Sequence, residues 1–350
     1  MTDLNNEEPL KDFLPQETAV PQAPPAIQEA NTQHTDISKV AALCYQMQQQ
    51  LQQVIVGQHH MVELLLAGIL ADGHILLEGV PGVAKTLTAR LMARMMDVQF
   101  SRIQFTPDLM PSDVTGTSIF NAQTGTFQFR QGPIFSNIVL IDEINRAPAK
   151  TQASLFEVME ERQVTIDGHS YHMGSPFLVL ATQNPIEHEG TYRLPEAQLD
   201  RFLIKISVGY PTLEEEILLL TRQNVKPVTE LLQDIQALVT PEELAAARLQ
   251  VRQVHVEEKL IAFIARIISE TRNDRSLYVG ASPRASVALL QVAKALAVLR
   301  GRNFVIPEDV IYAVAPVLRH RVSLTPDREM EGASTDDVLK EIVGRMEIPR

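Results

Sequence analysis

A glycine-rich turn stands between an apolar run and a helical pattern near residue 80. The turn covers residues 79–86, reads Gly-Val-Pro-Gly-Val-Ala-Lys-Thr, and directly follows the run at 74–78. Between a strand and a helix, such a turn lets backbone N–H groups and the helix N-terminus surround phosphate oxygens. We expect Lys85 to reach the outer phosphates of a triphosphate and the Thr86 hydroxyl to hold Mg²⁺. Ala84 replaces the usual second glycine but adds only a methyl group, so the loop should still form. The alternative is a plain strand-to-helix turn.

A second apolar run ends in two acidic residues. Residues 138–141 read Ile-Val-Leu-Ile, and Asp142 and Glu143 follow them. A continuously apolar run is typical of a strand that is covered on both faces. Hydrolysis of a triphosphate needs one carboxylate near Mg²⁺ and another that polarises water. We therefore expect Asp142 in the first role and Glu143 in the second. A solvated acidic turn is the alternative for this pair taken alone.

Three further polar residues are candidates for the same site. Asn184 follows the apolar run 177–181 and would orient the attacking water by hydrogen bonding. An Asn-Pro pair also commonly begins a turn, and both interpretations can hold together. Arg201 and Arg284 carry guanidinium groups, which can neutralise charge that develops on a transferring phosphoryl group. A surface ion pair is the alternative for each arginine.

The order of apolar runs predicts an α/β fold with a doubly wound parallel sheet. The expected strands alternate with helical patterns and cover residues 74–78, 98–105, 138–141, 177–181 and 203–207. Ligands of such sheets lie at the carboxyl ends of the strands, where the turn at 79–86 would also lie. After residue 211 the spacing of apolar residues becomes helical and predicts a small all-helical domain of about four to six helices. We predict three parts: a disordered acidic, proline-rich tail (1–35), an α/β nucleotide-binding domain (36–211) and a helical domain (212–350).

Composition and charge narrow the class of protein. The sequence holds no apolar run of about eighteen residues, so we expect no membrane span. The N-terminus shows no basic region followed by an apolar stretch, so no secretory signal is expected. The one cysteine, Cys44, lies on an apolar helical stripe, which fits a buried thiol and a reducing compartment. These observations predict a cytoplasmic protein.

The formal net charge of −12 argues against binding to a nucleic acid backbone. Residues 1–36 hold seven acidic residues and one lysine, so half of the excess charge lies in the first tenth of the chain. A local basic loop would still permit nucleic acid binding, so the net charge disfavours such binding without excluding it.

With these landmarks in order, the chain resembles the MoxR family of AAA+ ATPases over about residues 36–345. The resemblance rests on five motifs in family order: residues 79–86, 142–148, 181–185, 196–202 and 280–284. It implies that Lys85 and Thr86 belong to a Walker A motif, and that Asp142 and Glu143 belong to a Walker B motif. Asn184 would be sensor 1, Arg201 an arginine finger that enters the neighbouring subunit's site, and Arg284 sensor 2. The residues implied to contact ATP are Val56, Gly57, Gln58, Gly79, Val80, Pro81, Gly82, Val83, Ala84, Lys85, Thr86 and Leu87, and the implied Mg²⁺ ligands are Thr86 and Asp142.

The resemblance also implies an assembly and a kind of partner. Such families form ring homo-oligomers, usually hexamers, and couple ATP hydrolysis to remodelling of client or adaptor proteins, typically proteins with von Willebrand factor A domains. Residues 161–173 alternate around Asp-Gly, a strong hairpin signal, and residues 106–130 include a second hairpin-like stretch. Both are candidates for contacting the client, and ordinary structural hairpins are the alternative. His169 and His172 have no partners at metal-ligand spacing and are expected to be surface residues.

Three functions are compatible with these motifs. The first is an ATP-hydrolysing, chaperone-like remodelling protein. The second is a nucleotide-gated scaffold with incidental turnover, which would not need Glu143, Asn184 and Arg201. The third is a DNA-acting motor, which the acidic balance disfavours.

Overall fold

The computed structural model describes residues 36–79, 85–184, 192 and 194–349. These residues belong to one compact unit. The predicted N-terminal tail and residues 80–84 of the glycine-rich turn lie outside the described residues.

The centre of this unit is a parallel sheet of five strands in the order β2-β5-β8-β1-β9. Its strands are β1 (Ile75–Gly79), β2 (Phe100–Gln104), β5 (Ile138–Asp142), β8 (Leu178–Gln183) and β9 (Ile204–Val208). All five predicted strands are confirmed, and so is the doubly wound α/β fold. Every residue of β5 is buried, as its continuously apolar sequence requires.

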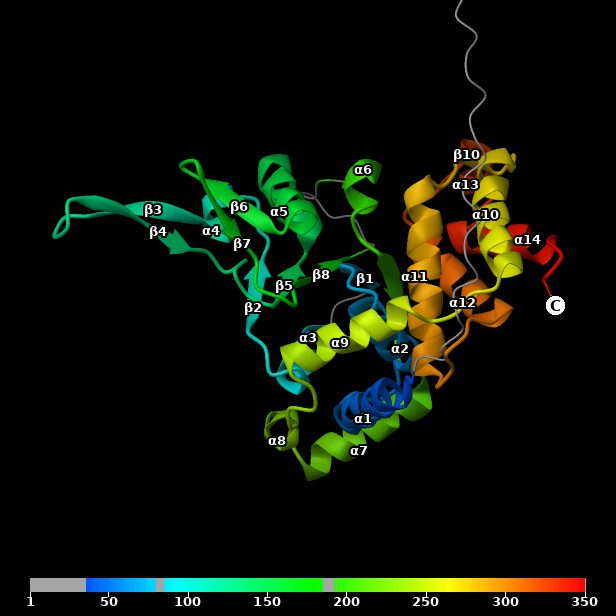
Figure 1. Ribbon diagram of the computed structural model, residues 1–350, viewed down its shortest axis with the longest axis horizontal. Coiled ribbons are helices and arrows are strands. Elements are labelled where there is room, and N and C mark those ends of the chain that lie inside the picture. The colour runs from blue at the N-terminus through cyan, green and yellow to red at the C-terminus, as the bar shows by residue number, and fades with distance from the viewer. Residues whose placement is uncertain (1–35, 80–84, 185–191, 193, 350) are drawn as a thin grey trace, which may run out of the picture. The chain divides into compact units, whose positions relative to one another are not determined.

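Helices cover both faces of this sheet (Figure 1). Along β5, Ile138 and Leu140 face one apolar core, whereas Val139 and Ile141 face the other. The first core includes side chains from α1 (Ser38–Val54), α2 (His59–Leu70) and α3 (Lys85–Met95). The second core includes Leu155, Phe156, Val158 and Met159 of α5 (Ala149–Glu161). Because successive side chains of a strand point to opposite faces, one apolar run supplies both cores.

Two hairpins interrupt the α/β pattern. The first joins β3 (Gly116–Asn121) to β4 (Thr126–Gln131), follows the short helix α4 (Pro111–Thr115), and extends away from the sheet (Figure 1). The second joins β6 (Gln163–Ile166) to β7 (His169–His172) through Asp167 and Gly168, which both have positive φ. Both predicted hairpins are therefore present.

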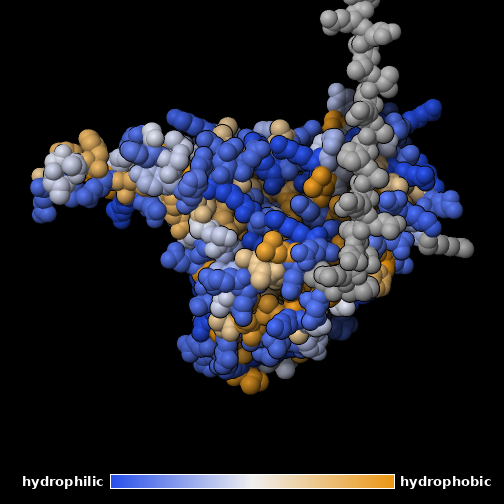
Figure 2. Space-filling view, in the orientation of Figure 1, coloured by the Kyte–Doolittle hydropathy of each residue, from blue (hydrophilic) through white to orange (hydrophobic). Residues whose placement is uncertain are grey.

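The two hairpins contact each other. The rings of Phe129 and Tyr171 lie 4.3 Å apart, and Ser118 Oγ donates to Asp167 Oδ2 at 2.5 Å. Phe120 and Phe127 lie near the end of the first hairpin and are 55% and 72% exposed, which Figure 2 shows as apolar colouring there. The two hairpins thus contact each other, and the first has an exposed aromatic end.

The remainder of the chain is mainly helical, but the predicted number of helices was too low. The described residues from 213 to 344 form eight helices: α7 (Leu213–Val225), α8 (Val228–Asp234), α9 (Pro241–Arg252), α10 (Glu258–Asn273), α11 (Pro283–Leu299), α12 (Pro307–Leu318), α13 (Pro326–Met330) and α14 (Thr335–Gly344). Short helices such as α8 and α13 have too few turns to show a periodic pattern. A small antiparallel pair, β10 (Leu277–Val279) and β11 (Ser323–Leu324), was not predicted either.

Close packing joins the helical region to the sheet. Helix α2 contacts both β9 and α11, and nine of its 12 residues are buried. Gly68 of α2 lets the helix lie close to the sheet, because a Cβ atom there would lie 2.5 Å from Cδ1 of Ile75 on β1 and 3.3 Å from Cδ1 of Ile204 on β9. Among the described helices, none has the length and apolar character needed to cross a bilayer.

Candidate active site

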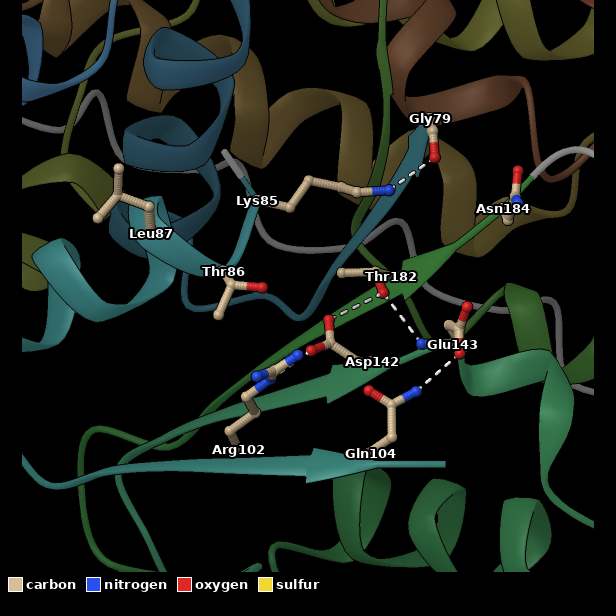
Figure 3. Close-up of a pocket in the computed structure, with 10 residues that line it drawn as sticks. All are labelled: Gly79, Lys85, Thr86, Leu87, Arg102, Gln104, Asp142, Glu143, Thr182 and Asn184. Carbon is tan, nitrogen blue, oxygen red and sulfur yellow. Dashed lines mark hydrogen bonds and ion pairs between the residues drawn. The ribbon is translucent and has the colours of Figure 1, made fainter. Parts of the chain in front are cut away.

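A cavity of about 440 Å³ opens at the carboxyl ends of the central strands. Figure 3 shows that its side chains come from β1, β2, β5 and β8 and from the start of α3. The lining residues are Gly79, Lys85, Thr86, Leu87, Arg102, Gln104, Asp142, Glu143, Thr182 and Asn184. The structure therefore gathers residues that lie about a hundred positions apart in the sequence at the edge where parallel sheets bind ligands.

Lys85 and Thr86 begin helix α3 and line the cavity. Lys85 Nζ donates to the carbonyl oxygen of Gly79 at 2.6 Å. Burial lowers the pKa of Lys85, while the nearby carboxylates of Asp142 and Glu143 act in the opposite direction. The ammonium group is thus held beside two acids, where a phosphate oxygen can replace the Gly79 carbonyl as its acceptor.

Asp142 is a buried carboxylate in the middle of this edge. It is 6% exposed and accepts hydrogen bonds from Arg102 Nε at 2.5 Å and from Thr182 Oγ1 at 3.2 Å. The Thr86 hydroxyl faces the same cavity (Figure 3). A carboxylate and a hydroxyl are hard oxygen donors of the kind that Mg²⁺ prefers.

Glu143 turns the chain out of β5 in the left-handed conformation, with φ 56° and ψ 53°. Its backbone N–H donates to Thr182 Oγ1 at 3.0 Å. Its carboxylate accepts from Gln104 Nε2 at 2.7 Å and lies 3.4 Å from Arg146 Nε. Because the backbone leaves the pleat here, consecutive residues Asp142 and Glu143 both face the cavity, as the sequence suggested.

Asn184 directly follows β8 and also lines the cavity. Strand β8 lies between β5 and β1 in the sheet. Asn184 therefore lies beside the end of the strand that carries Asp142. This placement is compatible with a hydrogen bond to a water molecule near Glu143.

Three lining residues were missed by the sequence reasoning. Arg102 and Gln104 lie two residues apart on β2, so they share one face, and they pair in register with Leu140 and Asp142. Thr182 lies on β8, one residue beyond the Ala181–Ile141 register pair, and bonds to both acids. A hydroxyl directly after the apolar residues 177–181 was an available signal for Thr182. The sequence alone did not show that β2 lies beside β5.

Other predicted contacts lie away from the cavity lining. Val56, Gly57 and Gln58 connect α1 to α2, and Gln58 Nε2 donates to the carbonyl oxygen of Gly209 at 3.0 Å. Gly57 has φ 66°, and a Cβ atom there would lie 2.5 Å from the Glu215 carboxylate. The start of α7 is thus packed against this connection. The predicted contacts Val80, Pro81, Gly82, Val83 and Ala84 lie outside the described residues.

The two candidate arginines converge on Glu160 of α5 rather than on the cavity lining. Arg201 donates to Glu160 Oε2 from Nε at 2.9 Å and from Nη2 at 2.8 Å. Arg284 Nη2 lies 3.3 Å from Glu160 Oε1. No cluster of three or more potential metal ligands of the His, Cys, Asp or Glu type occurs within the described ranges, and this includes the surroundings of His169 and His172.

Comparisons with known proteins identify the family of this chain. The family model described as "ATPase family associated with various cellular activities (AAA)" matches residues 74–204, and an AAA lid domain model matches residues 269–342. Over 310 residues, the chain is 47% identical to chaperone MoxR1 of Mycobacterium tuberculosis, covering 86% of this chain and 81% of that protein.

Further relatives agree. Uncharacterized protein YeaC of Bacillus subtilis is 46% identical over 299 residues, covering 85% of this chain and 92% of the relative. Protein MoxR of Paracoccus denitrificans is 32% identical, covering 79% and 87%. A crystal structure from Cytophaga hutchinsonii, of a protein provisionally assigned as an ATPase, superposes with a TM-score of 0.83 at 41% identity, covering 90% of this chain and 97% of that one. The chain therefore belongs to the MoxR family of AAA+ ATPases.

Proposed function

We propose that this chain is a chaperone-like ATPase that hydrolyses ATP to ADP and phosphate and uses the reaction to remodel partner proteins. The observation that carries the proposal is the single cavity that brings Lys85, Thr86, Asp142, Glu143 and Asn184 together at the carboxyl edge of the sheet. A surface turn or a structural ion pair would not require these five residue types in one cavity.

The residues of the cavity fit Mg²⁺ and ATP. Lys85 supplies a half-buried positive charge for the outer phosphates, and Thr86 and Asp142 supply oxygen ligands for the metal ion. Residues 79–87, apart from Pro81, which has no N–H, would supply backbone N–H groups to the phosphates, and Val56, Gly57 and Gln58 would line an adenine pocket. When bound, Mg²⁺ neutralises negative charge on the phosphate oxygens.

In this scheme Glu143 is the general base. Gln104 and Arg146 orient its carboxylate, and the left-handed backbone of Glu143 lets it face the same cavity as Asp142. Asn184 holds the attacking water by hydrogen bonding, as sensor 1. The proton of that water passes to a Glu143 carboxylate oxygen, and Asp142 remains available as a metal ligand.

We propose that the active form is a ring, with a hexamer as the expected state. Arg201 lies outside the cavity lining of its own subunit, which supports a role as an arginine finger in the neighbouring site. Arg284 belongs to the region matched by the lid model and would act as sensor 2. The proposed domains are residues 36–211, which hold the sheet, and residues 212–350, which hold the helical lid.

The partners are client or adaptor proteins, with von Willebrand factor A domain proteins as the proposed class, in the cytoplasm. The name of the Mycobacterium tuberculosis relative, a chaperone, supports this class of function. The hairpins β3–β4 and β6–β7 are the candidate client contacts, because Phe120 and Phe127 are exposed near the end of the first.

Phosphate release by the wild type and by Glu143→Gln tests the proposal. We expect the variant to bind ATP but to release phosphate about 100-fold more slowly, because the general base is lost. Glu157→Gln on the exposed side of α5 is the matched control and should keep the wild-type rate. A wild-type rate no higher than that of Glu143→Gln would instead indicate a nucleotide-gated scaffold. Stimulation of the rate by DNA at low salt would indicate a DNA-acting motor.

A further inference from the structure

A buried arginine of the lid holds the backbone on both sides of Arg201. Arg321 follows α12, and only 4% of its side chain is exposed. Its Nε donates to Asp200 Oδ1 at 2.6 Å, and its Nη2 donates to the carbonyl oxygens of Asp200 at 3.2 Å and Phe202 at 2.8 Å. Its Nη1 donates to the carbonyl oxygen of Leu203 at 3.0 Å. One guanidinium therefore fixes the residue before Arg201 and the two residues after it.

Two neighbours of Arg321 contact the same segment. His320 Nε2 hydrogen-bonds to the carbonyl oxygen of Phe202 at 2.9 Å, and Ser323 Oγ donates to Glu196 Oε1 at 2.6 Å. We call residues 196–203 the arginine segment, and we call His320, Arg321 and Ser323 the lid clamp. All three residues of the lid clamp lie within the range matched by the lid model.

The arginine segment is also anchored on the side of the sheet. Phe202 is fully buried, and its ring contacts Phe156 edge to face, with ring centres 5.9 Å apart. Arg201 itself points to Glu160 and keeps 28% of its side chain exposed. The backbone of the segment is thus fixed by the lid clamp, while the Arg201 side chain remains accessible at the surface.

We propose that Arg321 is a positioning residue that couples the lid of one subunit to the arginine finger which that subunit supplies to its neighbour. The inference rests on the proposed function of Arg201. Any change in the position of the lid relative to the sheet moves Arg321, and with it the backbone that carries Arg201. An arginine finger is sensitive to such movement, because a displacement of about 1 Å can cost about 100-fold in rate.

The number and kind of bonds favour this role over an ordinary ion pair. A structural ion pair needs one carboxylate, and Arg319 shows such a pair with Asp336 within the lid, at 2.8 Å. Arg321 instead spreads its donors over one carboxylate and three carbonyl oxygens of the arginine segment. Lysine cannot reproduce this planar fork, although it keeps the charge.

The test compares Arg321→Lys with the control Arg319→Lys in the full chain. We expect Arg321→Lys to lower kcat about 10- to 100-fold while ATP affinity and ring assembly stay within about twofold of wild type. Arg319→Lys should stay within about twofold in all three measurements. Asp200→Asn weakens the same contact from the other side and should reproduce the lowered kcat.

Mixed rings distinguish a role in the neighbour's site from a role in the subunit's own site. Glu143→Gln subunits hydrolyse ATP about 100-fold more slowly than the wild type but carry an intact lid clamp and an intact Arg201. Mixing them with Arg321→Lys subunits should raise the rate at least about fivefold above that of either variant alone, because complete interfaces then form. Arg201→Ala mixed with Glu143→Gln is the positive control.

Several results would overturn the proposal. A wild-type rate for Arg321→Lys, or a lowered rate that Glu143→Gln subunits do not restore although they restore Arg201→Ala, would show that Arg321 does not act through the finger. Loss of folding or of ATP binding in both Arg321→Lys and Asp200→Asn would show that the lid clamp is only a structural element. If the wild type shows no hydrolysis at all, the proposed ATPase function is wrong, and the proposed coupling of the lid to Arg201 is wrong with it.

Discussion

Arg102 Nε lies 2.5 Å from Asp142 Oδ2, so a guanidinium occupies one face of the carboxylate that we propose as a Mg²⁺ ligand. Half of the Arg102 side chain is exposed, whereas Asp142 is almost fully buried. The arginine can therefore turn away while the carboxylate stays in place, and the ion pair competes with metal binding at Asp142.

Arg102→Met should make Mg²⁺ bind more tightly. We expect the Mg²⁺ concentration for half-maximal ATPase activity to fall about two- to fivefold, the value of a partly exposed ion pair. Titration of Mg²⁺ at saturating ATP measures this change. Arg130→Met on the exposed hairpin strand β4 is the control. A higher Mg²⁺ requirement would mean that Arg102 assists the metal site instead.

Thr182→Val should impair catalysis more than ATP binding. The Thr182 hydroxyl donates to Asp142 and accepts from the Glu143 backbone N–H, and valine removes both bonds at constant shape. We expect a loss of about tenfold in kcat and of about 1 kcal/mol in unfolding free energy, because the part-buried Glu143 N–H loses its partner. Thr182→Ser keeps the hydroxyl and should stay near wild type. Equal effects of serine and valine would count against the hydrogen bonds.

Arg201→Ala should abolish turnover and leave ATP binding nearly unchanged. An arginine finger contributes about 1,000-fold or more to kcat, and the residue does not line its own cavity. Phosphate release and ATP titration measure the two quantities separately, with Arg266→Ala on the exposed face of α10 as the control. Rates in mixtures with Glu143→Gln should rise. Unrestored mixtures would indicate that Arg201 acts within its own chain.

His74 should make stability depend on pH. It is fully buried before β1; its Nδ1 accepts from the Val179 N–H at 2.9 Å, so its Nε2 carries the proton and donates to the Met159 carbonyl oxygen at 3.0 Å. Burial lowers the pKa of His74 to about 4. Between about pH 6.5 and pH 4 the unfolded chain therefore binds more protons than the folded one, and stability falls as pH falls.

Chemical unfolding at pH 7.5 and pH 5 checks this expectation. His74 should contribute about 2 kcal/mol to the loss of stability between these two conditions. His74→Gln should lack that part of the pH dependence, whereas His169→Gln, an exposed residue of β7, should keep it. Parallel pH profiles for the wild type and His74→Gln would contradict the assignment.

Much of the sheet could be predicted, because its strands are buried on both faces. The run at 138–141 contains no polar residue, which is typical of a strand buried on both faces. Strand β5 extends this run by one residue only. The expected strand at 98–105 is longer than β2, since Val98 and Phe105 are apolar but lie outside the paired residues. Where a strand begins and ends depends on the neighbouring strands with which it pairs, and the local sequence does not show these neighbours.

Some residues of the site could likewise be predicted from the sequence, and others could not. Lys85, Thr86, Asp142, Glu143 and Asn184 were predicted, because each follows or precedes a strand whose end defines the cavity. Arg102 and Gln104 were not, because their place depends on the order of strands in the sheet. The contacts of Arg201 and Arg284 with Glu160 were not predicted either, and Arg284 lies 124 positions from Glu160 in the sequence. Contacts of that kind depend on packing between elements rather than on any local pattern.

The backbone of Glu143 shows what this active site demands of the fold. A non-glycine residue held at φ 56° costs on the order of 1 kcal/mol, which glycine would relieve. Replacing Glu143 by glycine would thus relieve this backbone strain, but it would also remove the carboxylate that we propose as the general base. Selection of variants of this chain for thermal stability alone would therefore favour inactive proteins, because stability and turnover place opposite demands on position 143.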